Sequence, residues 1–118
     1  MKLRITRSTK NKVVTLEIAT VEFTTKEHQM LDQIGEPVID FNKLYGNNVI
    51  KFSKKIRSNF KVRVKFDANL ESDTDTTADY IEAFIEDLKD MLSEAMEQVA
   101  DQYSDFLIPA KQLINIEY

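Results

Sequence analysis

The chain of 118 residues contains no cysteine, only two glycines and two prolines, and a single histidine. Without cysteine it can form neither a disulfide nor a thiolate metal site, so a reducing cytoplasm is the expected location. The scarcity of glycine and proline leaves little room for low-complexity linkers or for glycine-rich loops that hold phosphate. We therefore expect a domain that is stabilised by its hydrophobic core alone.

Long apolar segments are also missing. The first residues, MKLRITRSTKNK, lack the apolar core of about seven or more residues that a secretory signal requires. No uncharged apolar stretch approaches the roughly 20 residues of a membrane-spanning helix. We predict one soluble domain over residues 1–118, without a membrane partner and large enough to bury about two-thirds of the surface of its unfolded chain.

Charge is distributed unevenly along the chain. Residues 1–66 contain fourteen Lys and Arg against six Asp and Glu, a net charge of +8, whereas residues 67–118 contain two against fourteen, a net charge of −12. The total of −4 conceals this separation. Such asymmetry bears on partners and association rather than on the fold.

The clearest periodic segment covers residues 76–103. Apolar residues recur in it at steps of three and four while Asp and Glu fill the other side, which predicts a long amphipathic helix. At 1.5 Å per residue this helix would be about 40 Å long, roughly twice the length of an ordinary strand. A sheet would not cover all of its apolar side. We therefore expect its C-terminal end to form an interface, either with a second copy of the chain or with residues 106–118, through Met96, Val99, Asp101, Tyr103 and Asp105.

The remaining segments show the alternation of β-strands. Strands are expected at residues 2–6, at 13–23, from Ile39 and Phe41 to a turn at residues 45–48, at 49–56 and at 60–66. A short helix, capped by Thr24 or Thr25 and stopped by Gly35, follows the second strand. Residues 106–118 could add an edge strand or form a loose tail.

The predicted order of elements is ββαβββα. It indicates an α+β fold, in which an antiparallel sheet of about five strands carries the short helix and the long C-terminal amphipathic helix on one face.

Residues suited to catalysis or to metal binding do not form a usable pattern. His28 is the only histidine, and a metal site needs three or four suitable ligands. The acidic residues 73–79 do not match a calcium loop, because Ala78 stands where glycine is required and Phe84 where glutamate is required. No serine lies in a strained glycine turn with a histidine to act as base. We expect a non-enzymatic protein without metal, cofactor or small-molecule ligand.

One run of basic residues exceeds what the composition alone would produce. Residues 43–65 contain eight Lys and Arg and no Asp or Glu, and alternate residues of a strand share a face. With the helices on the other face, this side would be open and positive, as phosphate contact requires. The predicted nucleic-acid-binding residues are Lys2, Arg4, Lys51, Lys55, Arg57, Lys61, Arg63 and Lys65.

The leading interpretation is a small intracellular binding protein that contacts phosphates of RNA or DNA. Little base readout is expected, because Phe52, Phe60 and Phe66 fall on the inward side of their strands and leave no aromatic platform for bases. One alternative is a module for protein interaction or homodimerisation that acts through the long acidic helix. Another is that the lysines are solvated and only protect the edges of the sheet from aggregation.

Overall fold

The computed structural model describes residues 1–68, 74–102 and 115–117. It confirms the α+β fold and the predicted order of elements, and adds one short strand at the end. The elements are β1 (Lys2–Lys10), β2 (Val13–Glu22), α1 (Thr25–Ile34), β3 (Val38–Tyr45), β4 (Asn48–Lys55), β5 (Lys61–Asp67), α2 (Thr74–Gln102) and β6 (Asn115–Glu117). No helix among the described residues is long and apolar enough to cross a membrane.

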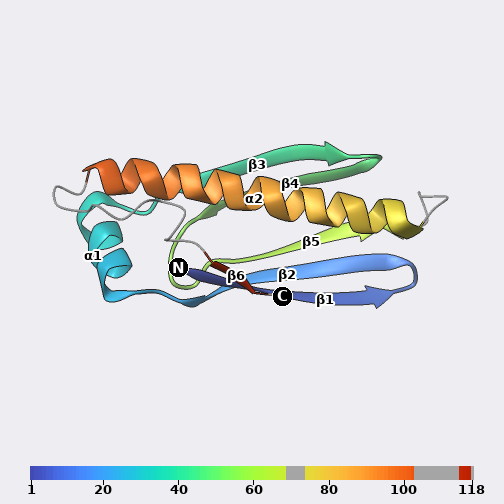
Figure 1. Cartoon of the computed structure of the whole chain (residues 1–118), viewed down its shortest axis with the longest axis horizontal. Coiled ribbons are helices and arrows are strands. Elements are labelled where there is room, and N and C mark those ends of the chain that lie inside the picture. The colour runs from blue at the N-terminus through green and yellow to red at the C-terminus, as the bar shows by residue number, and fades with distance from the viewer. Residues whose placement is uncertain (69–73, 103–114, 118) are drawn as a thin grey trace.

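The strands form two sheets, where the sequence led us to expect one. The larger sheet has the order β5-β2-β1-β6, and the smaller one is the β3–β4 hairpin. β4 and β5 face each other as edges (Figure 1), and the Asp67 N–H donates a hydrogen bond of 2.9 Å to Asn48 Oδ1 between them. The strands before α2 pair in antiparallel fashion, but β6 runs parallel to β1. Residues 115–117 are thus an edge strand, and residues 106–114 lie outside the described residues.

Each hairpin turns in two residues. Asn11 and Lys12 both have positive φ, 53° and 59°, as a type I′ turn requires, and Gly46 has φ 64° at the first central position, as in type II′. β1 is longer than the predicted strand at residues 2–6. Its last residues are all exposed and polar, and therefore show no apolar alternation from which the sequence could reveal a strand.

Helix α2 lies across one face of the two sheets and packs against both (Figure 1). Phe84 occupies the centre of the core: its ring lies 5.2 Å from Phe41 of the small sheet and 5.8 Å from Phe66 of the large one, both in edge-on contacts. Leu88 and Leu92 continue the buried side of the helix. The molecule is elongated along α2, with extents of 51 × 21 × 20 Å.

Helix α1 closes one end of the molecule against the C-terminal part of α2 (Figure 1). Thr24 and Glu27 form a capping box at its start, as the sequence predicts in part, and Gly35 ends it with φ 113°. Met30 and Leu31 bury its apolar side. The end of α2 is therefore covered from within the chain.

Helix α1 packs near the end of α2 at which the sequence analysis places an interface. Met96 and Val99 are 0 % and 4 % exposed, so they offer no apolar surface to a partner. Asp101 is exposed, while Tyr103 and Asp105 lie outside the described residues. The sequence showed an apolar stripe longer than a strand, but it did not show that α1 would pack against it.

Candidate nucleic-acid interface

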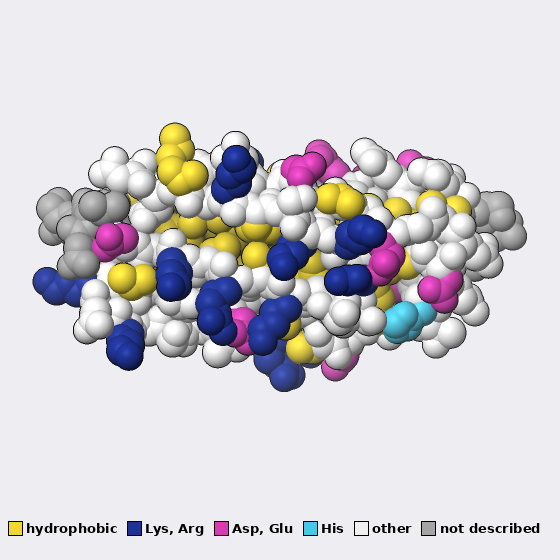
Figure 2. Space-filling model, turned by 180° about the vertical axis from the view of Figure 1, so that it is seen from behind, with side chains coloured by type: hydrophobic (Ala, Val, Ile, Leu, Met, Phe, Trp, Pro, Cys, Tyr) yellow, Lys and Arg dark blue, Asp and Glu magenta, His cyan; other side chains and the backbone are white. Residues whose placement is uncertain are grey.

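Strand β5 forms the middle of a basic surface. Its inward residues Val62, Val64 and Phe66 are buried, whereas the alternate residues Lys61, Arg63 and Lys65 are exposed on the side turned away from α2. Figure 2, which shows the molecule from behind, has Lys and Arg side chains spread across this side. The predicted arrangement of β5 is therefore confirmed.

Pairing with β2 and β1 extends the surface across the large sheet. Lys61 lies opposite Ala19 of β2, and Ala19 lies opposite Arg4 of β1, which places Arg4 and Lys61 in one row across three strands. Arg4 is exposed and Lys2, two residues before it, is half-buried. These two residues thus share the outward side with β5, because strand residues two apart point the same way.

Strand β4 and the bend after it supply the other predicted residues. Lys51 and Lys55 are exposed and alternate with inward residues, of which Ile50 is buried and Phe52 half-buried. The ring of Phe52 stacks inward on Phe41 at 5.1 Å. Arg57 is also exposed. As predicted, Phe52, Phe60 and Phe66 are on the inner side and do not provide an outward aromatic platform.

Glu17 is a charged residue of this surface that the sequence analysis missed. It projects from β2 among the cations of β5, where it accepts a hydrogen bond of 2.8 Å from Arg63 Nη2 and lies 3.3 Å from Lys61 Nζ. The interaction with Arg63, and to a smaller extent that with Lys61, holds the pKa of Glu17 below its usual 4.5. Glu17 is therefore ionised at neutral pH and offsets part of the positive charge. Only the register of β2 and β5 brings it there.

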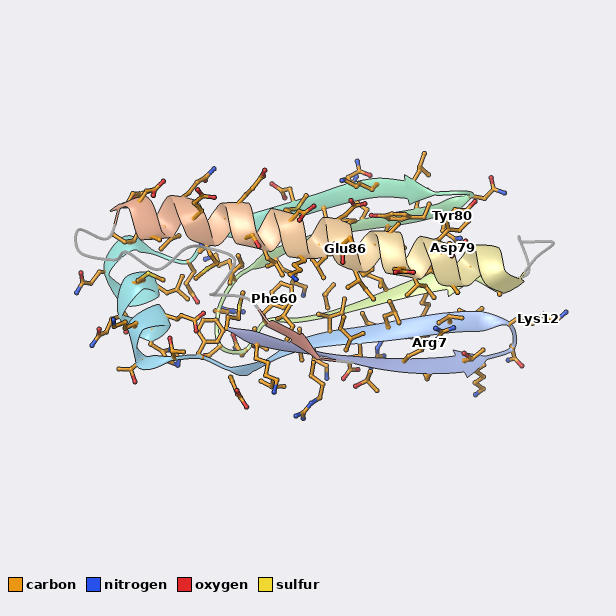
Figure 3. The ribbon with its side chains drawn as sticks, viewed as in Figure 1. Arg7, Lys12, Phe60, Asp79, Tyr80 and Glu86 are labelled. Carbon is orange, nitrogen blue, oxygen red and sulfur yellow. The ribbon has the colours of Figure 1, made fainter. Side chains whose placement is uncertain are left out.

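The acidic residues gather on the opposite side. The exposed side of α2 carries one lysine, Lys89, among Glu82, Glu86, Asp90, Glu94, Glu97 and Asp101. Figure 3 shows Glu86 on this helix and views the molecule from the side on which α2 lies in front of the sheets. The charge separation along the sequence thus becomes a separation in space, with a basic sheet side and an acidic helix side.

Several polar residues away from this surface have structural partners. The hydroxyl of Tyr45 donates a 2.7 Å hydrogen bond to Asp87 Oδ2, and burial together with this bond raises the pKa of Tyr45. The buried carboxylate of Glu27 pairs with the amino group of Met1 and accepts the N–H of Thr24. The ring of His28 lies 5.2 Å from that of Phe23. Among the described residues, no group of three or more potential ligands could hold a metal ion.

Comparison with known proteins adds no relative. No protein-family model matches the chain, and searches of curated proteins and of solved structures likewise found no match.

Proposed function

We propose that this chain is a cytoplasmic, non-enzymatic protein that binds RNA or DNA through phosphate contacts on the outward sides of β1, β4 and β5. The observation that carries the proposal is the separation of charge between the two sides of the molecule. Six exposed cations contribute to it. Lys51, Lys55, Lys61, Arg63 and Lys65 lie on the outward sides of β4 and β5, and Arg57 lies in the bend between these strands. A clustered basic face on a protein of negative total charge is the electrostatic footprint of polyanion contact.

The geometry suits contact with a phosphate backbone. Outward residues of one strand repeat about every 6.7 Å and neighbouring strands lie about 4.8 Å apart, so the cations form closely spaced rows. No aromatic side chain is among the exposed large hydrophobic residues of the described part. Binding should therefore depend on charge and discriminate weakly among bases.

The alternative, interaction through helix α2, has less support. The apolar side of α2 is buried within the chain, since Phe84, Leu88 and Met96 are fully buried. Its exposed side offers carboxylates to a partner but lacks the large apolar anchors on which protein interfaces depend. The basic sheet side remains the better candidate.

Salt dependence tests the proposal directly. We expect a fluorescently labelled duplex to bind with a log K that falls linearly with log salt, at a slope of about −5 if six cations contact phosphates. A slope of about −3.6 would correspond to four contacts, as expected if Glu17 keeps Lys61 and Arg63 occupied. Absence of binding at about 50 mM salt, where phosphate contacts are strongest, would refute the proposal.

Charge reversal locates the surface. Lys55→Glu combined with Lys65→Glu should remove binding, whereas Lys26→Glu combined with Lys89→Glu should leave most of it. All four lysines are exposed and both double variants change the net charge equally, but Lys26 and Lys89 lie on the helices. An equal loss in the two variants would show that only total charge matters and that the sheet side is not the binding site. Circular dichroism checks that both variants fold.

A further inference from the structure

The outer edge of β3 has no partner strand within the described part of the chain. β3 pairs only with β4. The two-residue turn makes Tyr45 and Asn48 a hydrogen-bonded pair, and the pairs Lys43–Ile50, Phe41–Phe52 and Ile39–Lys54 follow at steps of two. The backbone groups of the alternate residues therefore point away from β4: Val38, Asp40, Asn42 and Leu44. In Figure 1 no labelled element lies beyond this edge.

The same hairpin also carries most of the exposed large hydrophobic residues of the described part. Val38, Leu44 and Val49 are 52 %, 68 % and 63 % exposed, and they are three of the four exposed large hydrophobic residues in the described part. All three lie on the outward side of the hairpin, where Leu44 is directly opposite Val49. Figure 2 shows a hydrophobic group standing out on the rim of the molecule where this hairpin lies. Val38 and Leu44 stand near the two ends of the open edge.

β3 has little of the protection that edge strands usually have. Its charged residues are Asp40 and Lys43, which cancel, and Lys43 pairs with Asp87 at 3.6 Å. In contrast, each outward position from residue 61 to 65 in β5 is a cation, so two copies of β5 would repel each other. A long edge that is uncharged overall and carries apolar residues is suited to pairing with another strand.

We propose that the partner is a second copy of this chain, whose β3 pairs antiparallel with the first about a two-fold axis at Phe41. In this register Val38 faces Leu44 of the second copy, and Asp40 faces Asn42 of the second copy, whose amide can donate to the carboxylate. Every outward-pointing backbone group from residue 38 to 44 then finds a partner. The interface is self-complementary, as a two-fold dimer requires.

The neighbouring registers are worse on charge and on apolar contact. A shift by one residue would place residues whose backbone groups point away from β4 opposite residues whose groups are already bonded to β4. Only shifts by two therefore preserve the hydrogen bonds between the two copies. One such shift sets Asp40 opposite Asp40 of the second copy, and like charges directly opposite are destabilising. The other sets Leu44 opposite Asp40. Both separate Leu44 from Val38.

Pairing in this way would produce a continuous four-stranded sheet, β4-β3-β3-β4. The outward sides of both copies would then point in one direction and carry Lys51 and Lys55 of each copy on one surface. The inference rests on the open edge and not on the proposed function, because the dimer would form without nucleic acid.

Disulfide trapping tests the register, since the chain has no cysteine of its own. Residues opposite each other in a hydrogen-bonded antiparallel pair have Cα atoms about 5.5 Å apart, within the range a disulfide spans. A mixture of the single variants Val38→Cys and Leu44→Cys should therefore form a cross-linked dimer under mild oxidation, while neither variant alone should. Val49→Cys is the matched control: it is similarly exposed, but it lies two strand spacings, about 10 Å, from Val38 of the second copy.

The outcomes show whether the β3 edge pairs with a second copy or instead contacts another partner or solvent. Cross-linking of Val38→Cys with Leu44→Cys at several times the yield obtained with Val49→Cys supports the proposal. Equal yields in the two mixtures would overturn it. Light scattering of the unmodified chain should show a dimer at about 100 µM. The concentration is high because an interface of this small size is expected to bind with modest affinity. A monomer at that concentration would also overturn it.

Discussion

At the scale of single residues, Glu17 lowers the net positive charge of the basic surface. Its carboxylate is bonded to Arg63 and lies close to Lys61, so two cations of β5 are partly occupied inside the protein. A polyanion that uses these cations must compete with Glu17. Under the proposed function, Glu17 would therefore weaken nucleic-acid binding through its contacts with Arg63 and Lys61.

Replacing Glu17 should therefore strengthen nucleic-acid binding. In Glu17→Gln the two cations become available to phosphates, and the slope of log K against log salt should steepen by up to about 1.8, or 0.9 for each added contact. The measurement is a salt titration by fluorescence anisotropy. Glu86→Gln is the control, because it removes one negative charge from the exposed side of α2. Equal effects of the two variants would contradict the role of Glu17.

At the scale of elements, the tip of the β3–β4 hairpin is held against the start of α2. Gly46 has φ 64°, and a Cβ atom built on it would lie 2.6 Å from Tyr80 Cε2 and 2.8 Å from Tyr80 Oη. Figure 3 shows Tyr80 projecting from α2 toward this hairpin. Glycine is therefore required here twice, for the turn and for the contact with the helix.

The variant Gly46→Ala should lower the free energy of unfolding by about 1–3 kcal/mol, because alanine is strained at positive φ and meets the ring of Tyr80. In a Tyr80→Ala background the contact is gone, so the same substitution should cost less. Urea denaturation of the four proteins of this double-mutant cycle measures the difference. If Gly46→Ala costs the same in both backgrounds, the hairpin does not rest on Tyr80 as described.

At the scale of the whole molecule, one helix connects two sheets that share no backbone ladder. The rings of Phe41, Phe66 and Phe84 meet in the middle, and they belong to the small sheet, the large sheet and α2. Loss of packing along α2 should therefore unfold both sheets together.

The substitution Leu88→Ala tests this dependence. Leu88 is fully buried, so the free energy of unfolding should fall by about 2–5 kcal/mol from the lost apolar contacts and the cavity left behind. Lys89→Ala, at the next position but exposed, should change it by no more than about 0.5 kcal/mol. Urea denaturation followed by circular dichroism provides both values. A wild-type midpoint for Leu88→Ala would show that α2 does not form the core.

Much of the candidate site could be predicted because it depends on local periodicity. In β5, strict alternation of Val62 and Val64 with Lys61 and Arg63 is enough to assign the inward and outward sides, since strand side chains alternate whatever the neighbouring strands are. The same holds for α2, where the period of 3.6 residues separates Leu88 from the acidic side. Exposure of the six cations follows from this pattern.

What the sequence alone determined is therefore the type of each element and the side of it that is buried, because both depend on spacing within a few residues. Only the tertiary structure decided which segments meet. It split the strands into two sheets, packed α1 against the C-terminal part of α2, and brought Glu17 to Arg63, which is 46 residues away in the chain. Such contacts depend on register and on packing between distant segments, and no local pattern of residues encodes them.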